Sequence, residues 1–379
     1  MDSEHDLKRI LVVTGIFPPD IGGPATYVPK FAQFLVNNGF SVKVVTLGNS
    51  AESIKGEFAF EVIPIFREKN RFKRLYKTLE RLRHELTSAD FVFCNGLYYE
   101  TAIALRSMKF KCKNRSVVKV VGNPIWERSK NRELKIGISQ KPLSGMIYRL
   151  FAIIEEHLFR WSLRQFDQLT SPGWDLAKSL KNLDSQLEIE VIQNGVQIPV
   201  IDRLLDKPYD LVTVSRLVPW KNIDHVIDLA KLLNCSLAIV GEGPSEEKLR
   251  KLATTNHKIE FFGKQTPQRV AELMQQSKVF CQLSDYEGLS FSLLQAMSFG
   301  LPCVVSSIAA NQEAFISDPG AAIYYNKSDF QGAIQNIRTL LESNSMQREL
   351  GSRSRVIVLG SFTEERQLKK MMELLLKNA

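Results

Sequence analysis

The chain has 379 residues, a length that suits two domains better than one ordinary core. Hydrophobic residues make up 44% and charged residues 24%, which is typical of a globular protein and argues against a disordered or fibrous chain. No run of eighteen uncharged apolar residues predicts a membrane-spanning helix, and the acidic start MDSEHD is unlike a secretory leader. The five cysteines form no CxxC pair, so we expect neither a disulfide framework nor a zinc site, and a cytoplasmic location.

The net charge of +9 is unevenly distributed along the chain. Residues 1–200 carry 29 Lys and Arg against 21 Asp and Glu, whereas residues 201–379 are almost balanced. An excess of this kind predicts an anionic partner for the first half.

Strand and helix signals alternate along the whole chain. In the first half we expect strands at 10–16, 40–47, 61–66, 90–95, 117–121, 167–171 and 189–193, and helices at 26–36, 71–86 and 145–164. In the second half we expect strands at 210–214, 236–240, 259–262, 278–283 and 302–306, and helices at 222–233, 245–255, 267–276 and 289–299. Apolar strands separated by helices predict parallel sheets covered on both faces.

The fold class predicted from this alternation is α/β, with two doubly wound, Rossmann-like domains in tandem. We place the domains at 1–200 and 201–361, with a last amphipathic helix within 362–379. Because ligands of doubly wound sheets bind at the carboxyl ends of the strands, we expect the active site in a cleft between the two domains.

Residues 285–303, DYEGLSFSLLQAMSFGLPC, carry the most specific pattern in the chain. We expect the amides of Gly288, Leu289 and Ser290 on the first turn of a helix, where free N–H groups and the helix dipole favour a diphosphate. Glu287 precedes this turn and is suited to accept hydrogen bonds from a sugar, and Gln295 lies two turns further on. The alternative is that Glu287 and Gln295 are ordinary polar residues beside a helix start.

This segment resembles the nucleotide-binding signature of the retaining GT-B glycosyltransferases of family 4, also called glycosyl transferases group 1. That signature runs E-G-x-x-x-x-x-x-E and continues as A-M-x-x-G-x-P; the positions that match it are Glu287, Ala296, Met297, Gly300 and Pro302. The resemblance implies that Glu287 contacts the hydroxyls of the donor sugar. Gln295 stands where the family has a Glu that holds the ribose, so its hydrogen bonds would lack charge assistance.

A second constellation, VSRLVPWKN at 214–222, follows the first strand of the second domain. Arg216 and Lys221 are placed to neutralise the charge that a departing sugar leaves on a diphosphate, which a protein without a metal must do with its own cations. Ser215, Arg216 and Lys221 also match the family's G/S-R-L-x-x-x-K element. The alternative is a pair of solvated basic residues in a loop.

Two glycine loops complete the resemblance on the donor side. Gly22 and Gly23, in FPPDIGG, let the backbone approach a ligand closely and match a P-x-x-G-G loop that touches the donor phosphates in the family. Gly243, in the loop GEGP at 241–244, is similar to the family's V-G-x-G-P loop near the nucleotide.

Two further segments of the first domain resemble the family less closely. Asn123, within KVVGNPIWE at 119–127, stands where a subset of the family has Asp, and we expect it on the acceptor side. The segment QNGV at 193–196 looks like the family's P-N-G-V turn, and we interpret it as a structural Asn-Gly turn.

The stretch 67–83 is strongly basic and has apolar residues at helical spacing. Its basic residues are Arg67, Lys69, Arg71, Lys73, Arg74, Lys77, Arg81 and Arg83. Its apolar residues are Phe72, Leu75, Tyr76, Leu79 and Leu82. The charge favours peripheral contact with an anionic membrane at its inner, cytoplasmic face, or a lipid-linked acceptor. The alternative is that the apolar stripe packs on the sheet and the charges are solvated. No nucleic-acid motif accompanies the charge, so we expect no nucleic-acid partner.

The resemblance implies a retaining hexosyltransferase that moves a hexose-type sugar from a nucleotide-diphosphate sugar to a saccharide or lipid-linked acceptor, in cell-surface polysaccharide or lipopolysaccharide synthesis. It also implies that the first domain binds acceptor, that the second binds donor, and that the last helix crosses back to the first domain. We expect no cofactor and no metal, because no D-x-D pair is present. Two alternatives stay open: a non-catalytic nucleotide-sugar-binding protein, which Gln295 and Asn123 motivate, and a sugar-nucleotide 2-epimerase of the same fold.

Overall fold

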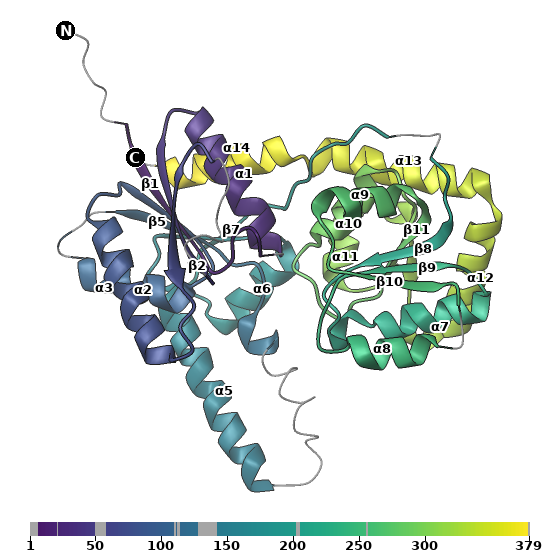
Figure 1. Cartoon of the computed structure of the whole chain (residues 1–379), viewed down its shortest axis with the longest axis horizontal. Coiled ribbons are helices and arrows are strands. Elements are labelled where there is room, and N and C mark those ends of the chain that lie inside the picture. The colour runs from purple at the N-terminus through teal and green to yellow at the C-terminus, as the bar shows by residue number, and fades with distance from the viewer. Residues whose placement is uncertain are drawn as a thin grey trace. The chain divides into compact units, whose positions relative to one another are not determined.

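The computed structural model describes residues 7–20, 22–49, 58–109, 111, 114–127, 142–201, 205–254 and 257–377, without the side chains of 142–149. Cys112 and residues 202–204, at the predicted domain boundary, lie outside the described residues. The chain forms two compact units, and each has its own parallel sheet (Figure 1). Unit 1 contains Met1–Ile192 and Leu368–Ala379, and unit 2 contains Gln193–Gln367.

Unit 1 is built on a seven-stranded parallel sheet with the strand order β3-β2-β1-β4-β5-β6-β7. Its elements are β1 (Arg9–Thr14), α1 (Gly23–Asn37), β2 (Ser41–Gly48), β3 (Glu61–Phe66), α2 (Arg71–Leu86), β4 (Phe91–Asn95), α3 (Tyr98–Met108), β5 (Arg115–Lys119), α5 (Pro142–Leu163), β6 (Gln168–Ser171), α6 (Trp174–Leu183) and β7 (Ile189–Val191).

The layers of unit 1 follow from the burial of its strands. All five residues of β4 are buried, because helices cover both faces of the sheet. On one face Phe93 meets Tyr27 and Phe31 of α1, whose rings lie 6.2 and 4.8 Å from the Phe93 ring. On the other face Val92 and Cys94 pack in clusters that contain residues of α2, α3, α5 and α6.

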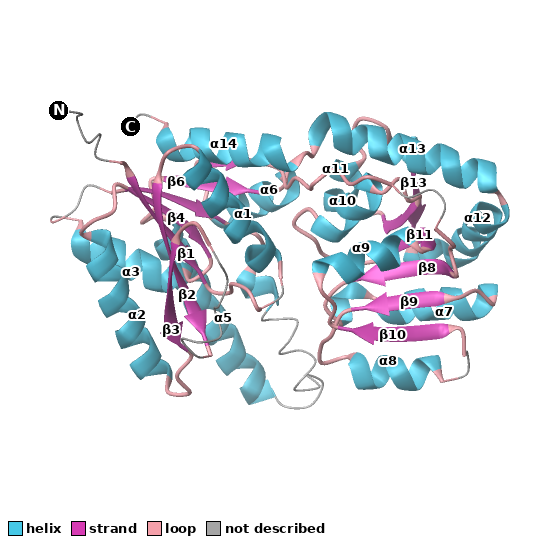
Figure 2. Cartoon of the chain, turned by 45° about the horizontal axis from the view of Figure 1, so that its top comes forward, coloured by secondary structure: helices cyan, strands magenta, loops and turns pink. Residues whose placement is uncertain are grey.

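Unit 2 is built on a six-stranded parallel sheet with the order β10-β9-β8-β11-β12-β13 (Figure 2). Its strands are β8 (Tyr209–Val214), β9 (Leu237–Val240), β10 (Ile259–Gly263), β11 (Ser277–Gln282), β12 (Cys303–Ser306) and β13 (Ala322–Tyr325). Its helices are η2 (Pro219–Lys221), α7 (Ile223–Leu233), α8 (Glu246–Ala253), α9 (Pro267–Gln275), α10 (Phe291–Ser298), α11 (Ala309–Ala314), η3 (Pro319–Ala321), η4 (Lys327–Asp329), α12 (Phe330–Glu342), α13 (Asn344–Ser361) and the start of α14 (Glu364–Leu376).

The α/β class with two doubly wound sheets is confirmed. The expected strands agree with the observed ones to within two residues at most ends, and the helix predicted at 71–86 has those bounds. Strand β13 was not predicted, because its four residues alternate between half-buried and buried and give only a short apolar run. No helix in the part of the chain that the structure describes is long and apolar enough to cross a membrane.

One charged side chain is completely enclosed in unit 1. Lys119 ends β5, is 0% exposed, and places its ammonium 3.9 Å from the centre of the Tyr27 ring. Removal from water penalises the charged amine, and this burial lowers the pKa of Lys119 to about 7. Burial also raises the pKa of Tyr27, whose ring covers the amine.

Lys119 should make the stability of unit 1 depend on pH. Between about pH 7 and the ordinary lysine value, the unfolded chain keeps the proton that the folded chain releases, so the free energy of unfolding rises with pH by up to about 1.4 kcal/mol per pH unit. We expect Lys119→Met to remove this slope and to stabilise the protein near neutral pH. Urea unfolding at several pH values tests this, with exposed Lys248→Met as the control; an unchanged slope in Lys119→Met would contradict it.

Candidate functional site

The carboxyl ends of β8 and β11 form the centre of the candidate site in unit 2. These two strands are hydrogen-bonded neighbours, although β9 and β10 lie between them in the sequence. The chain therefore leaves β8 and β11 toward opposite sides of the sheet, which makes this pair the topological switch point where doubly wound sheets bind ligands. The loop after β8 carries Ser215, Arg216 and Lys221, and the loop after β11 carries Glu287.

Two glycines allow the loop after β9 to pack directly on the loop after β8. A Cβ atom on Gly241 would lie 1.8 Å from the Ser215 oxygen, and one on Gly243 would lie 2.4 Å from the Leu217 oxygen. The Leu217 amide donates to the Glu242 carbonyl at 2.9 Å, and the Ser245 amide donates to the Leu217 carbonyl at 3.0 Å. Gly243 thus acts here by fixing the backbone that carries Arg216.

Asn222 joins the two loops of the switch point. It has a left-handed backbone (φ 50°) between η2 and α7, and its side-chain amide donates to the Leu283 carbonyl at 2.7 Å and to Asp285 Oδ1 at 2.9 Å. The Asp285 amide in turn donates to the Trp220 carbonyl at 2.8 Å. These bonds hold Lys221, between Trp220 and Asn222, beside the loop that carries Glu287.

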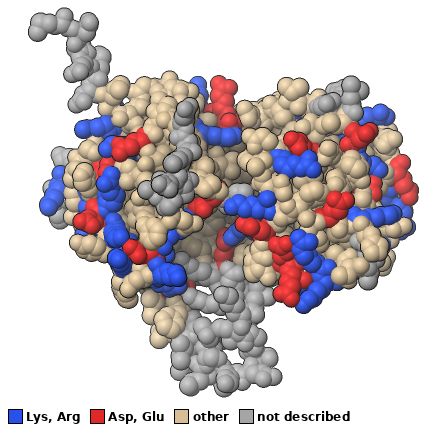
Figure 3. Space-filling model, viewed as in Figure 1, with Lys and Arg blue, Asp and Glu red and all other residues tan. Residues whose placement is uncertain are grey.

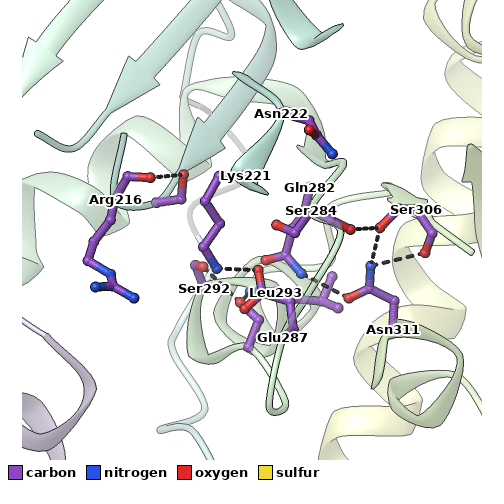
Figure 4. Close-up of polar contacts among 12 residues, drawn as sticks. Arg216, Lys221, Asn222, Gln282, Ser284, Glu287, Ser292, Leu293, Ser306 and Asn311 are labelled. Atoms are coloured by element: carbon purple, nitrogen blue, oxygen red, sulfur yellow. Dashed lines mark hydrogen bonds and ion pairs between the residues drawn. The ribbon is translucent and has the colours of Figure 1, made fainter. Parts of the chain in front are cut away.

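Lys221 and Glu287 form a nearly buried ion pair at this point (Figure 4). Lys221 Nζ lies 2.5 Å from Glu287 Oε1, and the two side chains are only 13% and 9% exposed. The exposed Arg216 side chain runs from the same loop in the same direction as Lys221 in Figure 4, and ends apart from the Lys221–Glu287 pair. The structure therefore brings Arg216, Lys221 and Glu287 to one edge of the sheet.

A buried polar network supports the ends of β11 and β12 beside the pair. Gln282 Nε2 donates to Asn311 Oδ1 at 2.9 Å, and Asn311 donates to the carbonyl and the hydroxyl oxygen of Ser306 at 3.0 Å each. Ser306 Oγ donates to the Ser284 carbonyl at 2.5 Å. Such a network holds the strand ends rigidly, and therefore also the start of the loop that carries Glu287.

The loop that follows Glu287 differs from the sequence-based expectation. Helix α10 begins at Phe291 with Ser290 as its N-cap, so Gly288 and Leu289 precede the helix and the prediction of a start at residue 289 was wrong. Ser290 Oγ accepts the Leu293 amide at 3.3 Å, because serine competes well for the N-cap. Glu287 is therefore not on the helix, and the two-turn spacing to Gln295 does not relate them. Gln295 lies on α10 with a half-buried side chain.

A hydrogen bond from an asparagine side chain stabilises an unusual backbone conformation at Leu289. Its φ of 145° is unusual for a residue with a side chain, and that side chain is only 3% exposed. The buried Asn194 donates to the Leu289 carbonyl at 2.8 Å and accepts from Gln367 Nε2 at 3.1 Å. Strained backbone costs about 1–3 kcal/mol and persists only when its surroundings hold it.

Asn194 is therefore a positioning residue, whereas the sequence predicted only a structural turn at this place. A Cβ atom on the adjacent Gly195 would lie 2.2 Å from the Thr363 oxygen, so the turn also receives the end of the chain. The likeness of QNGV to the family's P-N-G-V was the signal that pointed to it. Only the fold reveals that this turn reaches a residue 95 positions further on.

Gly22 and Gly23 lie in unit 1 at the start of α1. Gly22 has φ 152° and is the N-cap of α1, and its carbonyl accepts the Thr26 amide at 3.0 Å. Arg67, expected in a solvated basic face, instead donates to Asp20 and, at 3.3 Å, to the Gly15 carbonyl. Arg67 thus holds the loop that leads to the glycine pair.

Asn123 lies in unit 1 after β5, where its side chain caps a helical turn. Asn123 Oδ1 accepts the amides of Ile125 at 3.1 Å and Trp126 at 3.2 Å. Its oxygen is thus engaged locally, and an acceptor-side contact stays a prediction. Within the described ranges, no group of three or more His, Cys, Asp or Glu is placed to hold a metal ion.

Two doubly wound parallel domains in tandem define the GT-B class of glycosyltransferases. Solved structures share this fold over almost the whole chain: sucrose-phosphate synthase from Thermosynechococcus elongatus has a TM-score of 0.79 and 16% identity, covering 97% of this chain and 98% of its own. HepE of Anabaena, in complex with UDP and glucose, has a TM-score of 0.74 and 15% identity, covering 97% of this chain and 99% of its own.

The sequence comparisons agree with the fold. Residues 198–357, which lie within unit 2, match the family described as Glycosyl transferases group 1. An uncharacterized glycosyltransferase of Methanocaldococcus jannaschii is 23% identical over 96% of each chain. N-acetyl-alpha-D-glucosaminyl L-malate synthase of Bacillus anthracis is 25% identical over 55% of this chain and 59% of its own.

Replacing Asn194 tests whether it positions the loop at Leu289. Asn194→Ala removes two buried hydrogen bonds, and we expect the free energy of unfolding to fall by about 1–3 kcal/mol. We also expect weaker binding of nucleoside diphosphates, measured by calorimetry. The control is Gln193→Ala. Gln193 lies on the same turn, but its side chain donates to Glu313 Oε1 at 2.8 Å and not to Leu289. Equal loss of nucleotide affinity in both variants would contradict this role.

Proposed function

We propose that the chain is a retaining, metal-independent hexosyltransferase that moves a hexose-type sugar from a nucleotide-diphosphate sugar to a saccharide or lipid-linked acceptor. The observation that carries the proposal is the Lys221–Glu287 pair at the switch point of unit 2, with Arg216 on the same loop. In this proposal unit 2 binds the donor and unit 1 binds the acceptor. Cell-surface polysaccharide or lipopolysaccharide assembly is the proposed setting.

The chemistry follows from where charge develops during sugar transfer. When the bond between the anomeric carbon and the β-phosphate oxygen breaks, negative charge grows on the diphosphate. In this proposal Arg216 and Lys221 are the cations beside that charge, and charges held in place stabilise a transition state without reorganising. Glu287 would accept hydrogen bonds from the sugar hydroxyls, and the acceptor oxygen would attack from the face that the diphosphate leaves, with retention of configuration.

The ion pair also contributes to the stability of the fold. Glu287 holds Lys221 in place before the donor arrives, and a buried carboxylate without its cation would be destabilising by about 3–5 kcal/mol. When a diphosphate binds, Lys221 gains a second anionic partner. We therefore expect Lys221 to contribute to both donor affinity and fold stability, and the exposed Arg216 to contribute to donor affinity.

Thermal stabilisation by nucleoside diphosphates tests the donor site. We expect UDP, GDP or ADP to raise the melting temperature in the presence of EDTA, because a ligand that binds only the folded state stabilises it by mass action. UDP is the first to test, since HepE of Anabaena is described in complex with it. Arg216→Ala or Lys221→Ala should largely abolish the shift, whereas Lys251→Ala, which removes an exposed ion pair on α8, should not.

Because Lys221→Ala leaves Glu287 buried without its cation, the double variant Lys221→Met/Glu287→Gln serves as a folded comparison. A shift that survives in Arg216→Ala and in the double variant would exclude this diphosphate site. A shift that requires a divalent metal would exclude the metal-independent mechanism.

The stereochemistry of transfer separates the proposal from its alternatives. We expect the product to keep the anomeric configuration of the donor, as read from the anomeric proton coupling by NMR. Inversion would contradict the retaining mechanism. Donor binding without hydrolysis or transfer to any acceptor would favour a non-catalytic nucleotide-sugar-binding protein, and a change at C2 of the donor sugar would favour an epimerase.

A further inference from the structure

Helix α5 of unit 1 carries large apolar side chains on the side that faces away from the protein. Seven of its described residues are more than a third exposed: His157 and six large apolar residues. We call the six apolar residues the α5 ridge: Leu150 59%, Phe151 55%, Ile153 52%, Ile154 45%, Leu158 50% and Trp161 38%. At 100° per residue they occupy one side of the helix. The opposite side carries the buried Phe159, Ser162 and Leu163, with Glu155 and Glu156 half-buried toward it.

This arrangement reverses the usual amphipathic pattern. A surface helix ordinarily turns its apolar side to the core and its charges to water. Here the core requires only the residues around Phe159, which packs against Tyr98 and Tyr99 of α3. An exposed apolar stripe of this size, interrupted only by His157 among the described residues of the helix, is rare on a protein that has no partner, because each side chain orders water that burial would release.

Helix α2 provides a second exposed surface with a different character. Phe72 is 84% exposed and Tyr76 is 67% exposed, and the two rings lie about one helical turn apart. The sequence left open that the whole apolar stripe packs on the sheet. Leu82 does pack in the core, whereas these two rings do not. The same two turns of α2 also carry Arg71, Lys73, Arg74 and Lys77, and at 100° per residue Lys73 is the nearest of these to the two rings. We call these four residues, with Phe72 and Tyr76, the α2 basic face. Lys73 and Lys77 share one carboxylate, that of Glu68, so the face keeps a net positive charge.

The α5 ridge and the α2 basic face belong to one layer of unit 1. Helix α3 packs against both α2 and α5, and the three helices lie side by side on the same face of the sheet in both views (Figures 1 and 2). Because each helix runs antiparallel to the strands, the early residues of α2 and α5 lie toward the carboxyl edge of the sheet. Figure 3 shows Lys and Arg side chains gathered over α2.

We propose that unit 1 docks on an anionic bilayer, inserting the α5 ridge among the acyl chains while the α2 basic face contacts lipid phosphates. Charge complementarity selects a membrane as the occupant: exposed aromatic rings among Lys and Arg are suited to the headgroup region, and an apolar helix face is suited to the layer below it. A second copy of the chain would bring two like-charged α2 faces together.

Docking at the carboxyl edge has a consequence for the substrate. In a doubly wound sheet the ligand site lies at that edge, so docking would bring the acceptor site of unit 1 to the bilayer surface. The acceptor is therefore a lipid-linked glycan or a lipid headgroup. This step rests on the proposed sugar transfer, whereas the docking itself does not.

Flotation with vesicles tests the ridge. Wild-type protein should float with vesicles of phosphatidylcholine containing phosphatidylglycerol, and Ile154→Glu/Leu158→Glu should reduce the partition coefficient at least about tenfold, because two buried aliphatic contacts are lost. Both residues are exposed, so the variant should fold. The matched control is Leu232→Glu/Val356→Glu in unit 2, at residues 57% and 68% exposed, and it should float like the wild type.

A charge-reversal variant tests the basic face separately. Arg71→Glu/Arg74→Glu should lower the partition coefficient by about fivefold per residue and weaken its dependence on salt. The control Lys248→Glu/Arg338→Glu makes the same charge change on exposed residues of unit 2 and should have little effect. Equal flotation with pure phosphatidylcholine would overturn the anionic preference.

Two further outcomes would overturn the docking proposal. One is a ridge variant that floats like the wild type. The other is a wild-type dimer in sedimentation velocity that the ridge variant converts to a monomer without any change in flotation, which would make a second copy the occupant. Thermal stabilisation of the ridge variant by UDP is independent of both results, so a failure of docking and a failure of the donor site can be told apart.

Discussion

The ion pair between Lys221 and Glu287 depends on a meeting of two loops that the sequence separates by 66 residues. Parallel neighbours β8 and β11 bring the loops to one edge, and the side chain of Asn222 ties them together. Once these loops are fixed, a cation and a carboxylate face each other with little exposure to water. In such surroundings charges act on one another more strongly than at the surface, which suits the proposed stabilisation of a leaving diphosphate.

The surrounding residues serve mainly to hold this edge in shape. Gly241 and Gly243 permit close packing of backbone on backbone, Asn194 holds the unusual conformation at Leu289, and Gln282 and Asn311 brace the strand ends. In unit 1, Arg67 performs a similar task for the loop before Gly22. Preorganisation of this kind is distributed among residues whose contacts hold the backbone and side chains of the site in place.

Unit 1 shows a different distribution of charge and apolar surface. Lys119 is enclosed beneath Tyr27, while large apolar residues of α5 face outward. Burial of an amine that must give up its hydration and exposure of large apolar side chains are each unfavourable in water. The α5 ridge in particular is stable in water only because the other side of the helix is well packed around Phe159.

The sequence alone determined the α/β class, most strand and helix positions, and the resemblance to the group 1 glycosyltransferases, because apolar periodicity and the segments 214–222 and 285–303 are local signals. The sequence could not reveal the start of α10 at Phe291, since Ser290 and Leu289 are both compatible with a first turn until the N-cap bond to Leu293 is seen. The sequence also could not show that Phe72 and Tyr76 are exposed while Leu82 is buried, because helical spacing gives the side of the helix on which a residue lies but not what covers that side. Contacts between residues far apart in the chain, such as Asn194 with Leu289 and Lys221 with Glu287, were decided by the tertiary structure, because only strand order in a folded sheet brings those loops together.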